Sequence, residues 1–411
     1  MPTARDIIES ILEKPSVFRS RDKLYPEYVP AYLPHREEQL KNLATYFRPL
    51  LVEPGSISQR VLLVGSIGTG KTVTAKRFGS DFKQLARQRG INLEYVHVNC
   101  HRDRTLYLVV QEIARQLRIP IPPRGLSAQE MFHIILKYLE NRDMYVILTL
   151  DEFDYFIEVA GNDAVYFLVR TYDEHSEYTK RISFIFISRS LTSLSRLDSA
   201  TESYLVRNII NFKPYASREL YDILKYRSSE AFYEGTVGDD VLSYIAELVG
   251  ADTGGSGNAR LALEILLLAG QEADKEGAPR VTIEHVRRAF TQTNPDISVM
   301  VNDALPHLPL HELLILLAIV RTLQRSGEPY VRIGEVEAEY HHICEEYGET
   351  PRRHTQVYEY VMDLKRRSII ETRLSGKGYR GKSTLIGISV GPLDLLEKRI
   401  REIIEYKREE R

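Results

Sequence analysis

The feature that most constrains this 411-residue chain is a phosphate-loop motif of the pattern GxxxxGK[ST]. It reads Gly65-Ser66-Ile67-Gly68-Thr69-Gly70-Lys71-Thr72. An apolar run at Val61–Val64 precedes it, and a helical pattern follows it. Glycines let successive backbone N–H groups turn toward one anion, and a helix N-terminus adds partial positive charge. The segment therefore predicts a strand–loop–helix unit that binds nucleotide phosphates, whereas a glycine turn with a chance lysine would need neither flanking element.

Apolar runs elsewhere in the first half of the chain predict a parallel sheet. The runs are Arg60–Val64, Tyr95–Asn99, Tyr145–Leu150, Ile182–Ile187 and Ile209–Phe212. Their hydrophobicity is continuous, as in strands that are buried on both faces. The clearest helical patterns between or after them are Lys71–Gln88, Leu106–Gln116, Ala128–Asn141 and Ala164–Glu174. Alternating strands and helices indicate an α/β layer with helices on both sides of the sheet.

Two carboxylates, Asp151 and Glu152, follow the third of these runs. Ligands of open α/β sheets bind at the carboxyl ends of the strands. We expect Asp151 to join Thr72 in the Mg²⁺ shell, Lys71 to reach the β- and γ-phosphates, and Glu152 to orient the attacking water. Asp154 is more consistent with a role at a helix N-terminus. A solvated acidic turn is the alternative interpretation.

Changes in pattern divide the chain into three expected domains: an α/β nucleotide-binding domain at 1–215, an all-helical lid at 216–298 and a final domain at 305–411. The longest apolar run, Leu313–Val320, is far shorter than the ~20 residues needed to cross a bilayer. The chain has two cysteines and charged residues near its N-terminus. We therefore expect an intracellular protein that does not enter membranes.

The final domain has the plan of a winged helix. Helical patterns cover His311–Arg325, Ile333–Tyr347 and His354–Arg367, and strand patterns cover Ile369–Arg373 and Thr384–Ser389. Between residues 351 and 382 there are nine Lys or Arg and three acidic residues, in a chain of net charge −2. The start of a third helix contacts base edges in helix-turn-helix proteins. The residues expected to bind DNA are Arg352, Arg353, His354, Gln356, Lys377, Gly378, Tyr379, Arg380 and Lys382. A solvated hairpin or a protein-binding surface is the alternative.

Taken in order, these motifs resemble the AAA+ ATPases, and within them the archaeal origin-recognition proteins, over nearly the whole chain. Four segments carry the resemblance: Tyr28–Glu37, Lys213-Pro214-Tyr215 with Arg227, Gly257–Leu263 and Gly376–Lys382. The resemblance implies that the first lies near the adenine and that the second contacts nucleotide. It implies that Arg260, in the third, reaches the γ-phosphate, and that the fourth is a DNA-contacting wing. The residues thereby expected to bind nucleotide outside the phosphate loop are Val29, Tyr215, Arg227 and Arg260.

The resemblance further implies an initiator that binds duplex origin DNA under ATP/ADP control and is associated with the nucleoid. Its implied partners are the replicative helicase and a paralogous initiator. The family usually has Asn where Arg189 stands, and no clear arginine finger occurs at 198–203, although Arg196 or Arg207 could substitute. We therefore expect a weak ATPase that uses ATP as a switch. A second DNA contact at Arg102–Tyr107 and an ordinary surface helix there are equally compatible.

Two other functions fit parts of this pattern. A signalling ATPase could use the winged helix as a regulatory or protein-binding module, but such proteins usually carry repeat sensor domains. A small-molecule phosphotransferase would leave the terminal domain without a purpose. An ATP-dependent gel shift on origin duplex DNA distinguishes these alternatives from an initiator.

Overall fold

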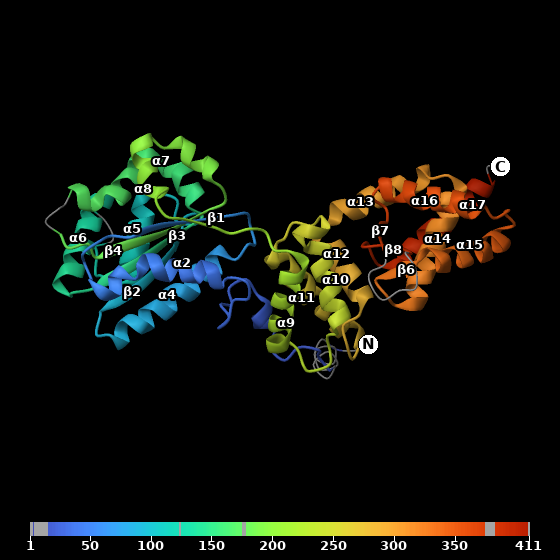
Figure 1. The fold of residues 1–411 in the computed structure, drawn as a ribbon, viewed down its shortest axis with the longest axis horizontal. Coiled ribbons are helices and arrows are strands. Elements are labelled where there is room, and N and C mark those ends of the chain that lie inside the picture. The colour runs from blue at the N-terminus through green and yellow to red at the C-terminus, as the bar shows by residue number, and fades with distance from the viewer. Residues whose placement is uncertain (1–2, 4–14, 123–124, 175–177, 375–382, 410–411) are drawn as a thin grey trace. The chain divides into compact units, whose positions relative to one another are not determined.

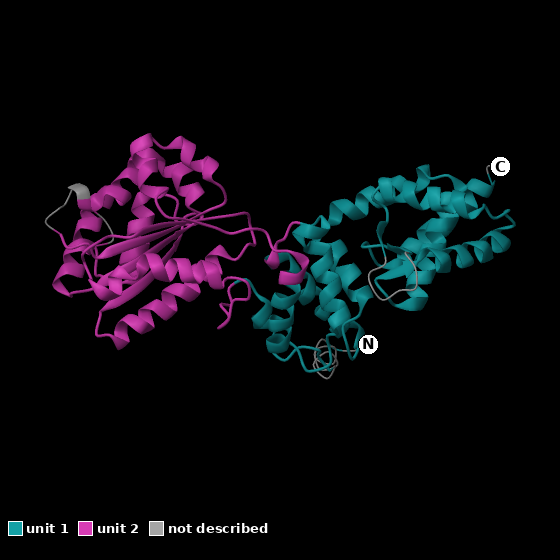
Figure 2. Cartoon of the chain, viewed as in Figure 1, with its two compact units in different colours: residues 1–26, 220–255, 260–411 teal, residues 27–219, 256–259 magenta. Residues whose placement is uncertain are grey.

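The computed structural model describes residue 3 and residues 15–122, 125–174, 178–374 and 383–409, which form two compact units (Figure 2). We call Glu27–Glu219 with Ser256–Ala259 the sheet unit. We call Met1–Pro26, Leu220–Gly255 and Arg260–Arg411 the helical unit. The apolar residues Ile7, Ile8, Ile11 and Leu12, whose spacing predicts one face of a helix, lie outside the described residues. The predicted boundaries at 215 and 298 stay predictions.

The sheet unit is built on a parallel sheet of order β2-β3-β4-β1-β5 (Figure 1). The strands are β1 (Arg60–Val64), β2 (Leu93–Asn99), β3 (Tyr145–Asp151), β4 (Ile182–Ser188) and β5 (Ile209–Asn211). Every residue of β3 and β4 is buried, as their continuous apolar pattern predicts. The register pairs Asn99 with Asp151, so polar side chains of neighbouring strands end at one edge.

Helices cover both faces of this sheet and enclose separate hydrophobic clusters. One face packs on α2 (Glu37–Phe47), α3 (Pro49–Val52) and α4 (Lys71–Gln88). The other packs on α5 (Leu106–Gln116), α6 (Ala128–Asn141), α7 (Phe153–Glu174) and α8 (Ser199–Leu205). The helix expected from Ala164 begins earlier, at Phe153, because α7 continues through a break at Gly161, whose φ of 75° suits glycine. The α/β fold class is confirmed.

The helical unit contains the lid and the winged helix. The lid helices are α9 (Ser217–Ala231), α10 (Asp239–Val249), α11 (Ala259–Glu276) and α12 (Ile283–Thr293), followed by α13 (Pro295–Ala304). The winged helix consists of α14 (Leu310–Ser326), β6 (Tyr330–Arg332), α15 (Ile333–Tyr347), α16 (His354–Arg366), β7 (Glu371–Leu374), β8 (Thr384–Gly387) and α17 (Leu393–Glu409). Its strands pair antiparallel in the order β6-β8-β7. Short 3-10 turns occur at Arg21–Leu24, Leu191–Arg196, Ala251–Thr253 and Leu305–His307.

The centre of the winged helix is α14, which is apolar on nearly all sides and almost entirely buried. It packs against α15, α16 and α17. Neither β6 nor α17 was expected from the sequence pattern. Within the described part of the chain, the longest apolar helices fall short of what a membrane crossing requires.

Candidate functional site

The phosphate loop has the strand–loop–helix setting that its motif predicts. It connects β1 to α4, and Gly68 and Gly70 adopt φ values of 76° and 88°, which favour glycine. The Lys71 ammonium is buried within the loop, where Nζ donates to Gly65 O at 2.5 Å and to Ser66 O at 2.8 Å. The loop is therefore folded around its lysine. The positive charge lies where the motif requires it to meet phosphate.

Arg36, in the resembling segment Tyr28–Glu37, contacts the phosphate loop. Its side chain is 4% exposed, and Nη2 donates to Thr69 O at 2.8 Å. The guanidinium lies 3.8 Å from the centre of the Tyr215 ring. Burial lowers the pKa of Arg36 despite neighbouring acids. Two of the resembling segments thus meet at the loop, and Arg36, which sequence reasoning included in a motif but did not single out, makes the contact. Val29 is half-buried, and its role at the adenine stays a prediction.

The segment that leads into α11 also contacts the loop. Ala259 N–H donates to Gly68 O at 3.0 Å, and Tyr215 N–H donates to Gly257 O at 3.0 Å. A Cβ on Gly68 would lie 1.7 Å from Oδ1 of Asn258, so only glycine permits this approach. The next residue, Arg260, is exposed, and it is the first residue of the range Arg260–Arg411 that belongs to the helical unit. Its contact with the γ-phosphate stays a prediction.

The two predicted magnesium ligands lie together. Asp151 ends β3, is 4% exposed, and accepts from Glu152 N–H at 2.9 Å. Burial by itself raises the pKa of Asp151. Hydrogen bonds from His97, the Thr72 hydroxyl and the Glu152 amide outweigh this and leave the pKa of Asp151 below its ordinary value. The carboxylate is therefore held ionised beside Thr72. Oxygen donors of this kind suit Mg²⁺, so the residues fit that ion.

The second acid, Glu152, faces an arginine. Glu152 has a φ of 54°, a left-handed conformation that is uncommon outside glycine and asparagine and concentrates at functional sites. Arg189 follows β4, with Nη2 4.0 Å from Glu152 Oε1 and Nε 3.6 Å from Asp154 Oδ2. Asp154 lies in the first turn of α7, as its sequence position predicts. Arg189 is thus in position to compete for the carboxylate that would orient water.

Arg227 and Tyr215, the predicted nucleotide-contacting pair, belong to different compact units. Arg227 is buried in the helical unit, where its guanidinium Nε donates to Lys23 O at 2.7 Å. Tyr215 lies under Arg36 in the sheet unit. A nucleotide contact of Arg227 stays a prediction.

The start of α16 presents the side chains that were predicted to meet DNA. Arg352, Arg353, His354 and Gln356 are all exposed. Their backbone is anchored from behind by the buried Tyr340, whose hydroxyl accepts from Arg352 N–H at 3.2 Å and lies 2.8 Å from His311 Nδ1. A rigid core thereby supports a cationic helix start. The wing residues Lys377, Gly378, Tyr379, Arg380 and Lys382 lie outside the described residues.

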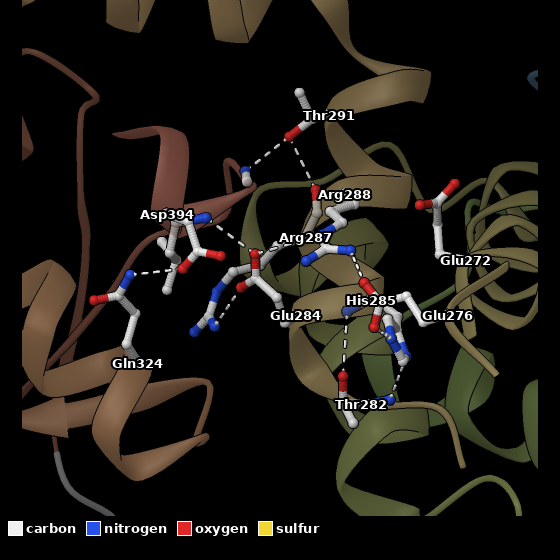
Figure 3. Close-up of polar contacts among 12 residues, drawn as sticks. Glu272, Glu276, Thr282, Glu284, His285, Arg287, Arg288, Thr291, Gln324 and Asp394 are labelled. Carbon is white, nitrogen blue, oxygen red and sulfur yellow. Dashed lines mark hydrogen bonds and ion pairs between the residues drawn. The ribbon is translucent and has the colours of Figure 1, made fainter. Parts of the chain in front are cut away.

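A buried arginine, Arg287, ties the lid to the winged helix within the helical unit. Figure 3 shows this arginine beside Glu284 and Thr291, with polar contacts of the surrounding residues. Arg287 of α12 is 1% exposed; Nε donates to Ile388 O at 3.0 Å and Nη2 to Glu328 O at 3.0 Å. Beside it, Gly391 N–H donates to the Thr291 hydroxyl at 2.9 Å. We call these contacts the Arg287 clamp. Because these contacts give backbone groups at the junction their hydrogen-bond partners, breaking them would cost free energy.

Further contacts extend the Arg287 clamp. The carboxylate of Glu284 accepts from Leu393 N–H at 3.0 Å, and the Tyr244 hydroxyl donates to Ile388 O at 3.2 Å. Arg373 of β7 pairs with Glu247 of α10 at 2.5 Å. The strand that leads into the wing is thus joined to a lid helix. Sequence reasoning missed this junction because none of these residues forms a local motif.

The phosphate loop, the paired acids, the helical lid and the winged helix together define an AAA+ protein with a DNA-binding type of terminal domain. Family models agree segment by segment. An "AAA domain" matches residues 58–192, a "Cdc6 AAA+ ATPase-type lid domain" matches 221–291, and a "CDC6, C terminal winged helix domain" matches 303–398.

Whole-chain relatives narrow the assignment. The chain is 47% identical to an "ORC1-type DNA replication protein 2" of Sulfolobus acidocaldarius, over 99% of this chain and 100% of the relative. Cdc6p from Pyrobaculum aerophilum has a similar structure, with a TM-score of 0.80, 34% identity, and coverage of 95% of this chain and 100% of that chain. This chain therefore belongs to the family of ORC1-type (Cdc6) archaeal DNA replication proteins and is a replication initiator of that family.

Two structures from Aeropyrum pernix were solved with ligands. Its ORC1 protein, in complex with DNA, has a TM-score of 0.60 and 29% identity, over 95% of this chain and 97% of that chain. Its ORC2 protein, in ADPNP–ADP complexes, has a TM-score of 0.64 and 25% identity, over 96% of this chain and 100% of that chain. Nucleotide binding is thus a property of the AAA+ relatives.

Proposed function

We propose that this initiator binds duplex origin DNA under ATP/ADP control and helps to recruit the replicative helicase in the nucleoid, in company with a paralogous initiator. The observation that carries the proposal is the Arg287 clamp, because it joins the lid to the winged helix, the domain whose third helix begins beside the exposed Arg352 and Arg353. The DNA-bound and nucleotide-bound relatives from Aeropyrum pernix support both halves.

ATP serves chiefly as a switch in this proposal. Lys71 binds the β- and γ-phosphates, and Thr72 and Asp151 hold Mg²⁺, which neutralises phosphate charge when bound. Glu152 orients water, and the nearby Arg189 competes for its carboxylate, so turnover is slow. Arg260 joins the lid to the γ-phosphate by charge-assisted hydrogen bonds. A ligand can shift a conformation only through a difference in affinity, and the γ-phosphate supplies that difference between ATP and ADP.

DNA binding by the intact protein should depend steeply on salt. If about four to six cations neutralise phosphates, the slope of log K against log[salt] should be roughly −4 to −5. Fluorescence anisotropy with an origin duplex at several salt concentrations measures this slope. Arg352→Ala should make it about 1 unit shallower. Arg399→Ala, an exposed change on α17, is the charge-matched control and should leave the slope unaltered. A flat salt response of the unmodified protein would remove the winged helix as the DNA-binding domain.

The switch itself is tested by Arg260→Ala. We expect the unmodified protein to bind the duplex with affinities that differ between ATP and ADP, and the variant to lose that difference, because the lid no longer senses the γ-phosphate. The measurement is duplex affinity in saturating ATP and in saturating ADP. An ATP/ADP ratio that the substitution leaves unchanged would rule out Arg260 as the sensor, while DNA binding itself would stand.

A further inference from the structure

We propose that His97 is a positioning residue of the nucleotide site: its Nε2–H holds the Asp151 carboxylate in the orientation required by the magnesium shell, and Tyr95 selects the tautomer that makes this possible. The inference rests on the proposed nucleotide function and names a residue that no part of the phosphate-loop or acidic motif includes. Its components are contacts within the sheet unit.

The first contact lies at the end of β3. His97 of β2 pairs in register with Thr149, two residues before Asp151. The ring Nε2 is 3.3 Å from Asp151 Oδ2, while Oδ1 of the same carboxylate accepts from Glu152 N–H at 2.9 Å. Each carboxylate oxygen thus has its own protein donor. A carboxylate held at both oxygens cannot rotate freely, so its remaining lone pairs point in a set direction.

The second contact determines which ring nitrogen carries the proton. Tyr95 Oη lies 3.1 Å from His97 Nδ1 and accepts from the Thr149 hydroxyl at 3.0 Å. A hydroxyl has one hydrogen to donate, and since Thr149 uses an acceptor site of Tyr95, that hydrogen is directed at Nδ1. Nδ1 is then the acceptor, and the proton of the neutral ring is on Nε2, facing Asp151. Burial raises the pKa of Tyr95, which keeps its donor hydrogen in place.

The chain Thr149–Tyr95–His97–Asp151 is built into the fold. Among the described strands β2 stands at one edge of the sheet, where its backbone would otherwise lack partners. Gln116 of α5 supplies them, because its Oε1 accepts from His97 N–H at 3.2 Å and its Nε2 donates to His97 O at 2.8 Å. Gly79 of α4 makes room for the tyrosine, since a Cβ there would lie 2.1 Å from the Tyr95 ring. The phosphate-loop helix itself therefore accommodates the relay.

Groups that hydrogen-bond to a metal-shell ligand typically change metal affinity by about 10- to 100-fold when removed. The experiment uses the full chain and a fluorescent ATP analogue, titrated first in EDTA and then with Mg²⁺. For His97→Leu we expect unchanged nucleotide affinity in EDTA and a roughly tenfold higher Mg²⁺ concentration for half-maximal tightening. His97→Gln should lie within about threefold of the unmodified protein, because its amide N–H replaces the ring donor toward Asp151.

Tyr95→Phe keeps the ring beside Gly79 and removes only the hydroxyl, and it should raise the Mg²⁺ midpoint about threefold. The matched control is Tyr178→Phe, which breaks a second Tyr–His pair, to His133 at 3.1 Å, in the same unit and should change nothing. Circular dichroism checks that each variant is folded. If His97→Leu does not fold, Tyr95→Phe decides the outcome.

The possible outcomes separate this inference from the proposed function. A Mg²⁺ midpoint that is the same in Tyr95→Phe and His97→Leu as in the unmodified protein overturns the role of His97 while nucleotide binding stands. An equal rise of the Mg²⁺ midpoint in His97→Leu and His97→Gln also overturns it. The effect would then come from the packing of the ring and not from its hydrogen bond to Asp151. An unmodified protein that binds nucleotide but ignores Mg²⁺ overturns the inference and the proposed Mg²⁺ role of Thr72 and Asp151, while nucleotide binding stands. One that binds no nucleotide overturns both.

Discussion

Lys71→Ala should weaken ATP binding at least about a hundredfold, which corresponds to roughly 3 kcal/mol of lost binding free energy. Lys71 lies inside the phosphate loop at 8% exposure, where its ammonium is positioned to meet a highly charged ligand in a low-dielectric setting. A charge-assisted hydrogen bond there is worth more than one at the surface. The measurement is isothermal titration calorimetry with ATP.

A second readout follows from linkage. A ligand that binds only the folded state raises its stability, so saturating ATP should raise the melting temperature of the unmodified protein and leave that of Lys71→Ala nearly unchanged. Lys76→Ala, on the same helix and half-buried, is the matched control and should retain the ATP-dependent shift. An ATP affinity within threefold of the unmodified protein in Lys71→Ala would remove the loop as the phosphate site.

Arg287→Ala should destabilise the helical unit by about 3 kcal/mol. The substitution would remove the Arg287 donor from the Glu328 carbonyl, leave the Ile388 carbonyl with only the Tyr244 hydroxyl, and open a cavity between α12 and the winged helix. Denaturant titration of the full chain, followed by circular dichroism, measures the loss. Arg288→Ala is the control: this neighbour is partly exposed and pairs with Glu276 and Glu284, so it should cost less than about 1 kcal/mol.

The same variant tests the coupling. If the Arg287 clamp transmits lid movement, Arg287→Ala should reduce the ATP/ADP difference in DNA affinity under conditions where the protein is still folded. Equal stability of Arg287→Ala and Arg288→Ala would show that the clamp contributes no more than a surface ion pair. An undiminished ATP/ADP difference in a destabilised variant would separate stability from signalling.

Local motifs carried much of the prediction. The phosphate loop, the acids after β3 and the third helix of the winged domain are short segments whose chemistry depends on neighbours in sequence. The helix patterns of the chain are periodic and strongly apolar. For this reason the predicted bounds of α4, α5, α6 and α15 agree with the structure. The helix α17 also has a helical spacing of apolar residues, which are buried at 393, 396, 400, 403 and 404. It was not predicted, because many charged residues lie between these positions.

By itself the sequence determined the fold class, the nucleotide motif and the basic start of α16, because periodicity and turn chemistry act over a few residues. Only the tertiary structure decided how Arg36, His97 and Arg287 are used. Arg36 reaches Thr69 across 33 positions, and Arg287 reaches Ile388 across 101. Such contacts form because buried donors and acceptors need hydrogen-bond partners, and the folded chain supplies these from residues far apart in sequence. A local sequence pattern does not show which distant residue will be the partner.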